Sequence, residues 1–152
     1  MLRRGLLLAI AICLCSVPSV GNQDSSPDVK VELNSQKPLW LHITIRSCAE
    51  SRVSFYKYLL PWGNLNSMKL VAMTPGEDYL KTFYPTDDPS PEKVSFGPNE
   101  QQNGDIDLHM KIVGLDAALK KSDVFLFWAY AAPKELNIAH YSGGWILIPR
   151  QK

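Results

Sequence analysis

Apolar and polar side chains alternate with a period of two along the first part of the chain. The alternation is strictest over LWLHITIRS, where four aliphatic residues oppose four others: Leu39, Leu41, Ile43 and Ile45 against Trp40, His42, Thr44 and Arg46. Successive side chains of a β-strand lie on opposite faces, so this pattern predicts a half-buried strand. The same alternation over Asp28–Leu33 predicts another strand, and the intervening NSQKP predicts a turn.

Four further segments have strand patterns, and loops separate them. The predicted strands cover residues 52–62, 68–74, 93–96 and 105–112. In the last of these, the side chains expected to point inward are Ile106, Leu108, Met110 and Ile112. Prolines in residues 75–92 and polar residues in 97–104 are typical of loops. Gly114–Lys121 contains good helix formers and predicts one or two helical turns.

The C-terminal part of the chain is the most apolar and aromatic. Between Val124 and Tyr130 both faces of the predicted strand are apolar, which is typical of a strand in the middle of a sheet or one with a covered face. Gly143 and Gly144 predict a bend, followed by a last strand that Pro149 ends. We therefore expect the chain to finish in a hairpin that helps to close the core.

These elements predict an all-β fold with one short helical connector. Seven to eight short strands separated by turns indicate an antiparallel, immunoglobulin-like β-sandwich. Residues 28–152 are expected to form this single domain.

The first 27 residues have a different character. Arg3 and Arg4 precede the apolar run Gly5–Cys15, and small residues follow at Ser19 and Gly21. This order is typical of a signal peptide, predicted at residues 1–21, with a flexible segment at 22–27. The protein is then expected to be exported, periplasmic or secreted, without a transmembrane anchor in the mature chain. The alternative is a lipoprotein modified at Cys13 or Cys15, although Ile12 and Leu14 precede them where a small residue is usual.

The net charge bears on the class of partner, and the cysteine count bears on disulfide bonds. The full chain has a net charge of +1, and removal of Arg3 and Arg4 leaves 14 basic and 15 acidic residues. No basic run is present, so the sequence does not predict nucleic-acid binding. Cleavage would leave Cys48 alone, so no internal disulfide is expected in the mature chain.

Candidate catalytic and metal-ligating residues are few. Asp105, Asp107 and His109 alternate along one predicted strand, so they could share a face and hold a metal, or form its solvent face. Cys48 could be a reactive thiol or an incidental cysteine. Ser142 precedes two glycines but lacks the Gly-x-Ser-x-Gly elbow. The sequence therefore predicts no enzyme and no cofactor.

Aromatic residues are the stronger candidates for recognition. Trp40, His42 and Arg46 form one row on the outward side of their strand, and Trp and Arg are enriched at interface hot spots. Tyr56, Tyr58 and Trp62 extend this surface if the third strand pairs alongside. They could instead fill the core of a sandwich.

Four motifs carry a family resemblance: LLPWG (Leu59–Gly63), GDIDL (Gly104–Leu108), FWAY (Phe127–Tyr130) and GGWILIP (Gly143–Pro149). In these motifs the chain resembles a poorly characterised group of small exported bacterial proteins with an immunoglobulin-like β-sandwich. It is similar, more distantly, to sandwich domains of protease inhibitors and of metalloprotease propeptides. The resemblance implies a structural scaffold and assigns no catalytic residue.

The predicted function is that of an exported, non-catalytic binding module. Protein–protein recognition is the leading hypothesis, of an inhibitor or immunity type. One alternative is a carbohydrate-binding module of the cell envelope, in which sugar rings stack on the aromatic residues. The other is an enzyme of unrecognised type.

Overall fold

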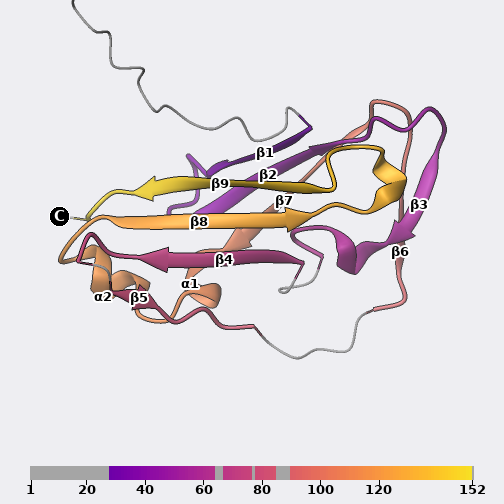
Figure 1. The fold of residues 1–152 in the computed structure, drawn as a ribbon. Helices are drawn as coiled ribbons and strands as arrows, with labels where there is room; N and C mark the ends of the chain where they lie inside the picture. Colours follow the sequence, from indigo (N-terminus) through magenta and orange to yellow (C-terminus); the bar gives the residue numbers. More distant parts are fainter. Residues whose placement is uncertain (1–27, 64–66, 77, 85–89, 152) are drawn as a thin grey trace, which may run out of the picture.

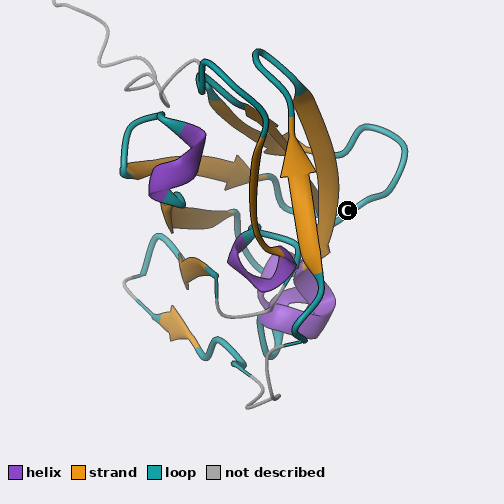
Figure 2. Cartoon of the chain, turned by 90° about the vertical axis from the view of Figure 1, so that its right-hand side faces the viewer, coloured by secondary structure: helices purple, strands orange, loops and turns teal. Residues whose placement is uncertain are grey.

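The computed structural model of this 152-residue chain describes residues 28–63, 67–76, 78–84 and 90–151. The predicted signal peptide (1–21) and flexible segment (22–27) lie outside the described residues. The described part consists mostly of strands in three antiparallel sheets, with only short helical segments (Figures 1 and 2). An antiparallel all-β fold is thus confirmed.

The strands divide among the sheets as follows. The three-stranded sheet has the order β1 (Val29–Leu33), β2 (Trp40–Arg46), β7 (Gln101–Asp107). The four-stranded sheet has the order β5 (Tyr79–Leu80), β4 (Met68–Met73), β8 (Val124–Ala131), β9 (Tyr141–Ile148). The third sheet pairs β3 (Val53–Tyr56) with β6 (Lys93–Phe96). The helical segments are α1 (Leu108–Lys111), α2 (Leu115–Leu119), and the 3₁₀ turns η1 (Lys57–Leu59) and η2 (Lys134–Leu136).

One hydrophobic core joins the sheets. In Figure 1 the four-stranded sheet lies in front of the three-stranded sheet. Inward side chains of β2 and β8 belong to the same buried cluster: Leu41, Ile43, Ile45, Leu126, Trp128 and Tyr130. Burial alternates along both strands, as their apolar patterns predict. The two sheets therefore face each other across a shared core, and each has an outer face.

The final hairpin is confirmed, but the predicted bend at Gly143 and Gly144 is wrong. Both glycines lie within β9, which pairs with β8 along its whole length. Gly144 is the cross-strand partner of Trp128, and a Cβ at this glycine would lie 3.1 Å from the indole ring. The missing side chain makes room for Trp128 to pack against the neighbouring strand.

The predicted strand over residues 105–112 is also wrong in its second half. β7 ends at Asp107, and this residue caps α1 by accepting a hydrogen bond from the backbone N–H of His109 at 2.9 Å. Met110, expected to point inward, is 63% exposed. Leu108 and Ile112 remain buried because residues four apart share one side of a helical turn. The strand begins earlier than expected, within the predicted loop 97–104.

The third strand is shorter than predicted. It ends at Tyr56, well before Pro61, and continues as the turn η1. Its partner β6 is only four residues long and begins just after Pro91, which has no backbone N–H to donate to a ladder. The ladder ends at the pair Tyr56 and Lys93, and the backbone N–H of Lys57 still donates to the carbonyl of Glu92 at 2.8 Å.

Candidate functional site

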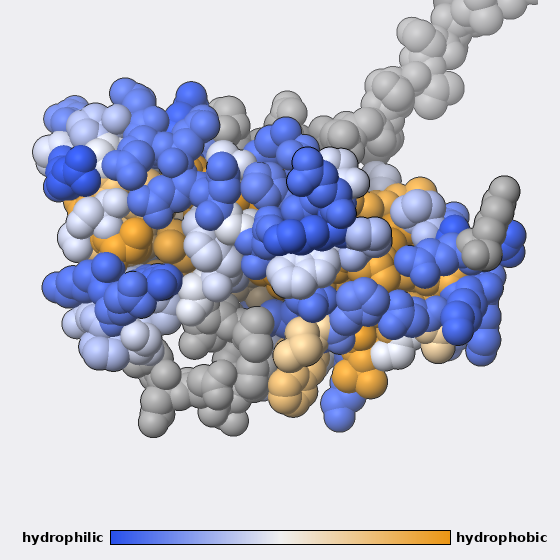
Figure 3. Space-filling view, turned by 180° about the vertical axis from the view of Figure 1, so that it is seen from behind, coloured by the Kyte–Doolittle hydropathy of each residue, from blue (hydrophilic) through white to orange (hydrophobic). Residues whose placement is uncertain are grey.

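The predicted recognition residues of β2 lie on the outer face of the three-stranded sheet. Trp40, His42 and Arg46 are all partly buried there, opposite Asp107, Asp105 and Gln101 of β7. Figure 3, which shows the molecule from behind, displays a mostly hydrophilic surface on this side. The row is thus a solvated polar face with one indole in it.

Arg46 is held by an ion pair at the edge of this face. Its Nη2 and Nε donate to Asp28 Oδ1 at 2.8 and 3.2 Å. The Cys48 thiol donates to the same oxygen at 3.3 Å. Burial, and secondarily this hydrogen bond, raises the pKa of the Cys48 thiol above its usual value. A nucleophilic cysteine needs a lowered pKa, so these contacts favour an unreactive thiol.

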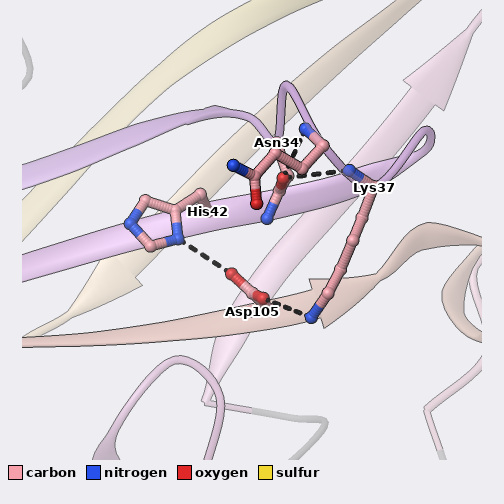
Figure 4. Close-up of polar contacts among 5 residues, drawn as sticks. Asn34, Lys37, His42 and Asp105 are labelled. Atoms are coloured by element: carbon pink, nitrogen blue, oxygen red, sulfur yellow. Dashed lines mark hydrogen bonds and ion pairs between the residues drawn. The ribbon is translucent and has the colours of Figure 1, made fainter.

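His42 belongs to a polar cluster that bridges two strands and a turn (Figure 4). Its Nδ1 lies 2.8 Å from Asp105 Oδ1, and Lys37 Nζ donates to Asp105 Oδ2 at 3.0 Å. The hydrogen bond from His42, followed by that from Lys37, lowers the pKa of Asp105. Beside this cluster is a hollow of about 360 Å³, lined by Glu32, Leu33, Asn34, Ser35, Gln36 and His42.

The candidate metal ligands are not brought together. Asp105 contacts His42, whereas Asp107 caps α1 and His109 lies on α1 itself. His109 Nδ1 is 3.1 Å from Asp116 Oδ2. The expectation that the three share one strand face is therefore wrong. Within the described ranges, no three His, Cys, Asp or Glu residues are grouped so that they could hold a metal ion.

Tyr56, Tyr58 and Trp62 do not extend the row of Trp40. The two tyrosine rings stack with their centroids 5.3 Å apart, but β3 pairs with β6 and not with β2. Trp62 is half-buried against the backbone of Gly104, where its indole occupies the space that a side chain would need. The predicted aromatic surface is thus divided among separate parts of the molecule.

A second candidate surface is the outer face of the four-stranded sheet, and it is apolar. The register aligns Val71, Phe127 and Trp145 in one row across β4, β8 and β9, and aligns Met73, Phe125 and Leu147 in the next. We call these six residues the apolar face. Tyr79 on β5 is the cross-strand partner of Met73 and adjoins this face. This face is exposed to solvent: the exposed fractions of Val71, Phe127, Trp145 and Leu147 are 47, 41, 43 and 42%.

Nothing in the described part of the chain covers this face. In Figure 1, no described helix or strand crosses in front of β4, β8 and β9. Lys69 is the one charged residue among the outward positions of these strands and β5. An antiparallel sheet normally has polar residues on its solvent face. The two outer faces of this molecule therefore differ sharply, and the apolar one resembles a surface meant to be covered.

The sequence signal for this face was partial. The apolar outward residues of β8 predicted a covered face or a central strand, and β8 is indeed central. The contributions of Val71, Trp145 and Leu147 depend on the register with β4 and β9, which the sequence does not show.

The described residues contain no helix long and apolar enough to span a membrane. Comparisons with protein-family models, curated proteins and solved structures found no match for this chain. The resemblance to exported bacterial sandwich proteins therefore stays a prediction, and function must be argued from the two outer faces.

Proposed function

We propose that this protein is an exported, non-catalytic recognition domain that binds another protein through the apolar face. The observation that carries the proposal is the exposed, register-aligned set of apolar side chains on β4, β8 and β9. Contiguous exposed apolar surface on a soluble protein marks an interaction site, because leaving it in water is unfavourable. The site lies on three strands joined by the continuous β4–β8 and β8–β9 ladders, which limits the ordering entropy lost on binding.

The chemistry of the face favours a protein over other partners. Lipid surfaces attract apolar patches that have a basic rim, and Lys69 is the one basic residue among the outward positions of β4, β5, β8 and β9. Sugars need several polar groups to orient their hydroxyls, whereas the six residues supply only the Trp145 indole N–H. Protein interfaces combine an uncharged, aromatic centre with a polar surround. Phe127 and Trp145 are adjacent at the centre and are our candidate hot spots.

Export and the finer fold assignment belong to the same proposal. The signal-peptide pattern supports a periplasmic or secreted location, where an inhibitor or immunity partner would be met. An immunoglobulin-like arrangement is supported by two antiparallel sheets that face each other across one core. The function itself rests on the surface and not on that fold analogy.

Site-specific photocrosslinking in the native host tests the proposal. Photoreactive p-benzoylphenylalanine replaces Trp145 in one variant and Thr44, on the opposite outer face, in a matched control. We expect the probe at 145 to capture a distinct protein that the probe at 44 does not capture. Phe127→Thr, which replaces the ring by a small residue of high strand propensity, should weaken binding of the purified partner by about 30-fold or more with little change in melting temperature.

Three results would contradict the proposal. Crosslinks only between copies of this chain would make the face a self-association surface. Capture of a protein from position 44 alone would show that the binding surface is the outer face of β2, which contains Trp40. Unchanged affinity in both Phe127→Thr and Trp145→Thr would remove the apolar face from the interface.

A further inference from the structure

The hollow beside His42 lies on the other outer face of the molecule, away from the apolar face. Its volume of about 360 Å³ is large enough for one small ligand. Five of its six lining residues are polar: Glu32, Asn34, Ser35, Gln36 and His42. Two neighbouring strands and the turn between them supply these side chains.

The turn that forms one wall is held in a fixed shape. Asn34 Oδ1 accepts hydrogen bonds from the backbone N–H groups of Gln36 and Lys37 at 2.9 and 3.0 Å. The backbone N–H of Asn34 donates to the carbonyl of Trp40 at 2.8 Å. Side-chain hydrogen bonds of this kind stabilise the turn locally, in addition to the pairing of the strands on either side. The hollow is therefore largely formed before any ligand binds.

The His42 ring is fixed in the same way. Asp105 Oδ1 lies 2.8 Å from Nδ1, so the carboxylate accepts the proton carried by Nδ1 when the ring is neutral. That tautomer leaves Nε2 as a hydrogen-bond acceptor. Lys37 holds the other oxygen of Asp105, which keeps the carboxylate from turning away.

The charges around the hollow are already paired. Glu32 forms an ion pair with Lys30 at 2.7 Å, and Asp105 forms one with Lys37 at 3.0 Å. A cationic or anionic ligand would have to compete with these pairs. The groups left over are neutral: the side-chain amide nitrogen of Asn34, the Ser35 hydroxyl, the Gln36 side-chain amide and Nε2 of His42 have no hydrogen-bond partner among the described residues.

This set contains both donors and acceptors, closely spaced and without net charge, as adjacent sugar hydroxyls require. Trp40 lies outside the lining, two residues along the same face of β2, with Lys37 Nζ 4.9 Å from its ring centroid. We infer that the hollow binds one unit of a neutral saccharide through Ser35, Gln36 and Nε2 of His42. This site is separate from the protein-binding face and does not depend on it.

Nuclear magnetic resonance titration of the folded chain tests this inference. The probes are glucose, galactose, mannose and N-acetylglucosamine, with glucuronate and glucosamine as their charged counterparts. We expect at least one neutral sugar to shift the amide signals of residues 32–37 and 42. We expect Gln36→Ala and Ser35→Ala each to weaken that binding about fivefold, the effect of one lost hydrogen bond. Thr44→Ala, on the same strand face outside the hollow, should bind as the wild type does.

Both variant side chains are exposed and make no hydrogen bond to the described residues, so the fold should be unaffected and the spectra will show it. Absence of localised shifts up to the solubility limit of every neutral sugar would overturn the inference. So would equal affinity in the wild type and both variants, or tighter binding of a charged counterpart.

Discussion

The ammonium group of Lys111 is buried without a hydrogen-bond partner among the described residues. The residue is 1% exposed, and its Nζ lies 5.2 Å from the centroid of the Tyr84 ring. Lys69 is placed similarly, 5.0 Å from the same centroid, and has the same sign of charge. Burial, and then repulsion from Lys69, lowers the pKa of Lys111 to about 8. Among the described residues, only the cation–π contact with Tyr84 compensates for the lost water.

Lys111→Met should therefore stabilise the protein by about 1–3 kcal/mol at neutral pH, because it keeps the side chain's length and removes a buried charge that has no hydrogen-bond partner in the described ranges. The pKa of this lysine is about 8 in the folded chain and about 10.4 when unfolded. Between these values the unfolded state binds more protons, so the penalty is complete below pH 8 and disappears as pH rises through 10. Denaturant unfolding of both proteins at several pH values measures the difference.

Lys120→Met, at the exposed residue that follows α2, is the matched control and should change stability little at any pH. A destabilised Lys111→Met protein, or a stability gain that does not shrink between pH 8 and 10, would show that the ammonium has a partner in solution.

At the scale of the element, a strand could be predicted from the sequence only where its hydrophobic pattern fits a strand and does not also fit a helix. β2 was predicted because strict alternation over nine residues fits no helix. Residues 105–112 alternate equally well, but Leu108 and Ile112 are also four residues apart, as on one side of a helix. The pattern therefore fits both a strand and a helix. The deciding signal was Asp107, whose carboxylate caps α1. The polar cluster around His42 could not be foreseen, because Asp105 reaches His42 only through the β2–β7 register.

The β8–β9 pairing gives an element-level prediction. A chain that stops after Tyr141 loses nearly all of β9, including buried Ile148, and leaves β8 as an unpaired apolar edge. Such an edge promotes aggregation. We expect this truncated chain not to melt cooperatively, as followed by circular dichroism and light scattering. A chain that stops after Pro149 keeps β9 and should melt as a folded protein. Cooperative melting of the shorter chain would show that β9 is dispensable.

At the scale of the whole molecule, the polar and apolar outer faces make it two-sided. A domain with one apolar side needs its partner close by, and export would decide which partners it can meet. We predict that the mature chain begins at Asn22, because the basic, apolar and small-residue segments occur in the order of a signal peptide. Intact mass of the protein recovered outside the cytoplasm measures this. A lipid-modified amino terminus at Cys13 or Cys15, or an uncleaved cytoplasmic chain, would be incompatible with it.

The contact of Trp62 with Gly104 constrains how this sequence can evolve. The indole occupies the space of a Cβ at 104, so any larger residue there collides with a ring that is itself packed against the core. A side chain cannot be added at 104 while Trp62 is kept in place. In diverging descendants, a side chain at 104 should therefore appear only together with a smaller residue at 62. Such a linked exchange would identify a distant relative even after the surface residues have changed beyond recognition.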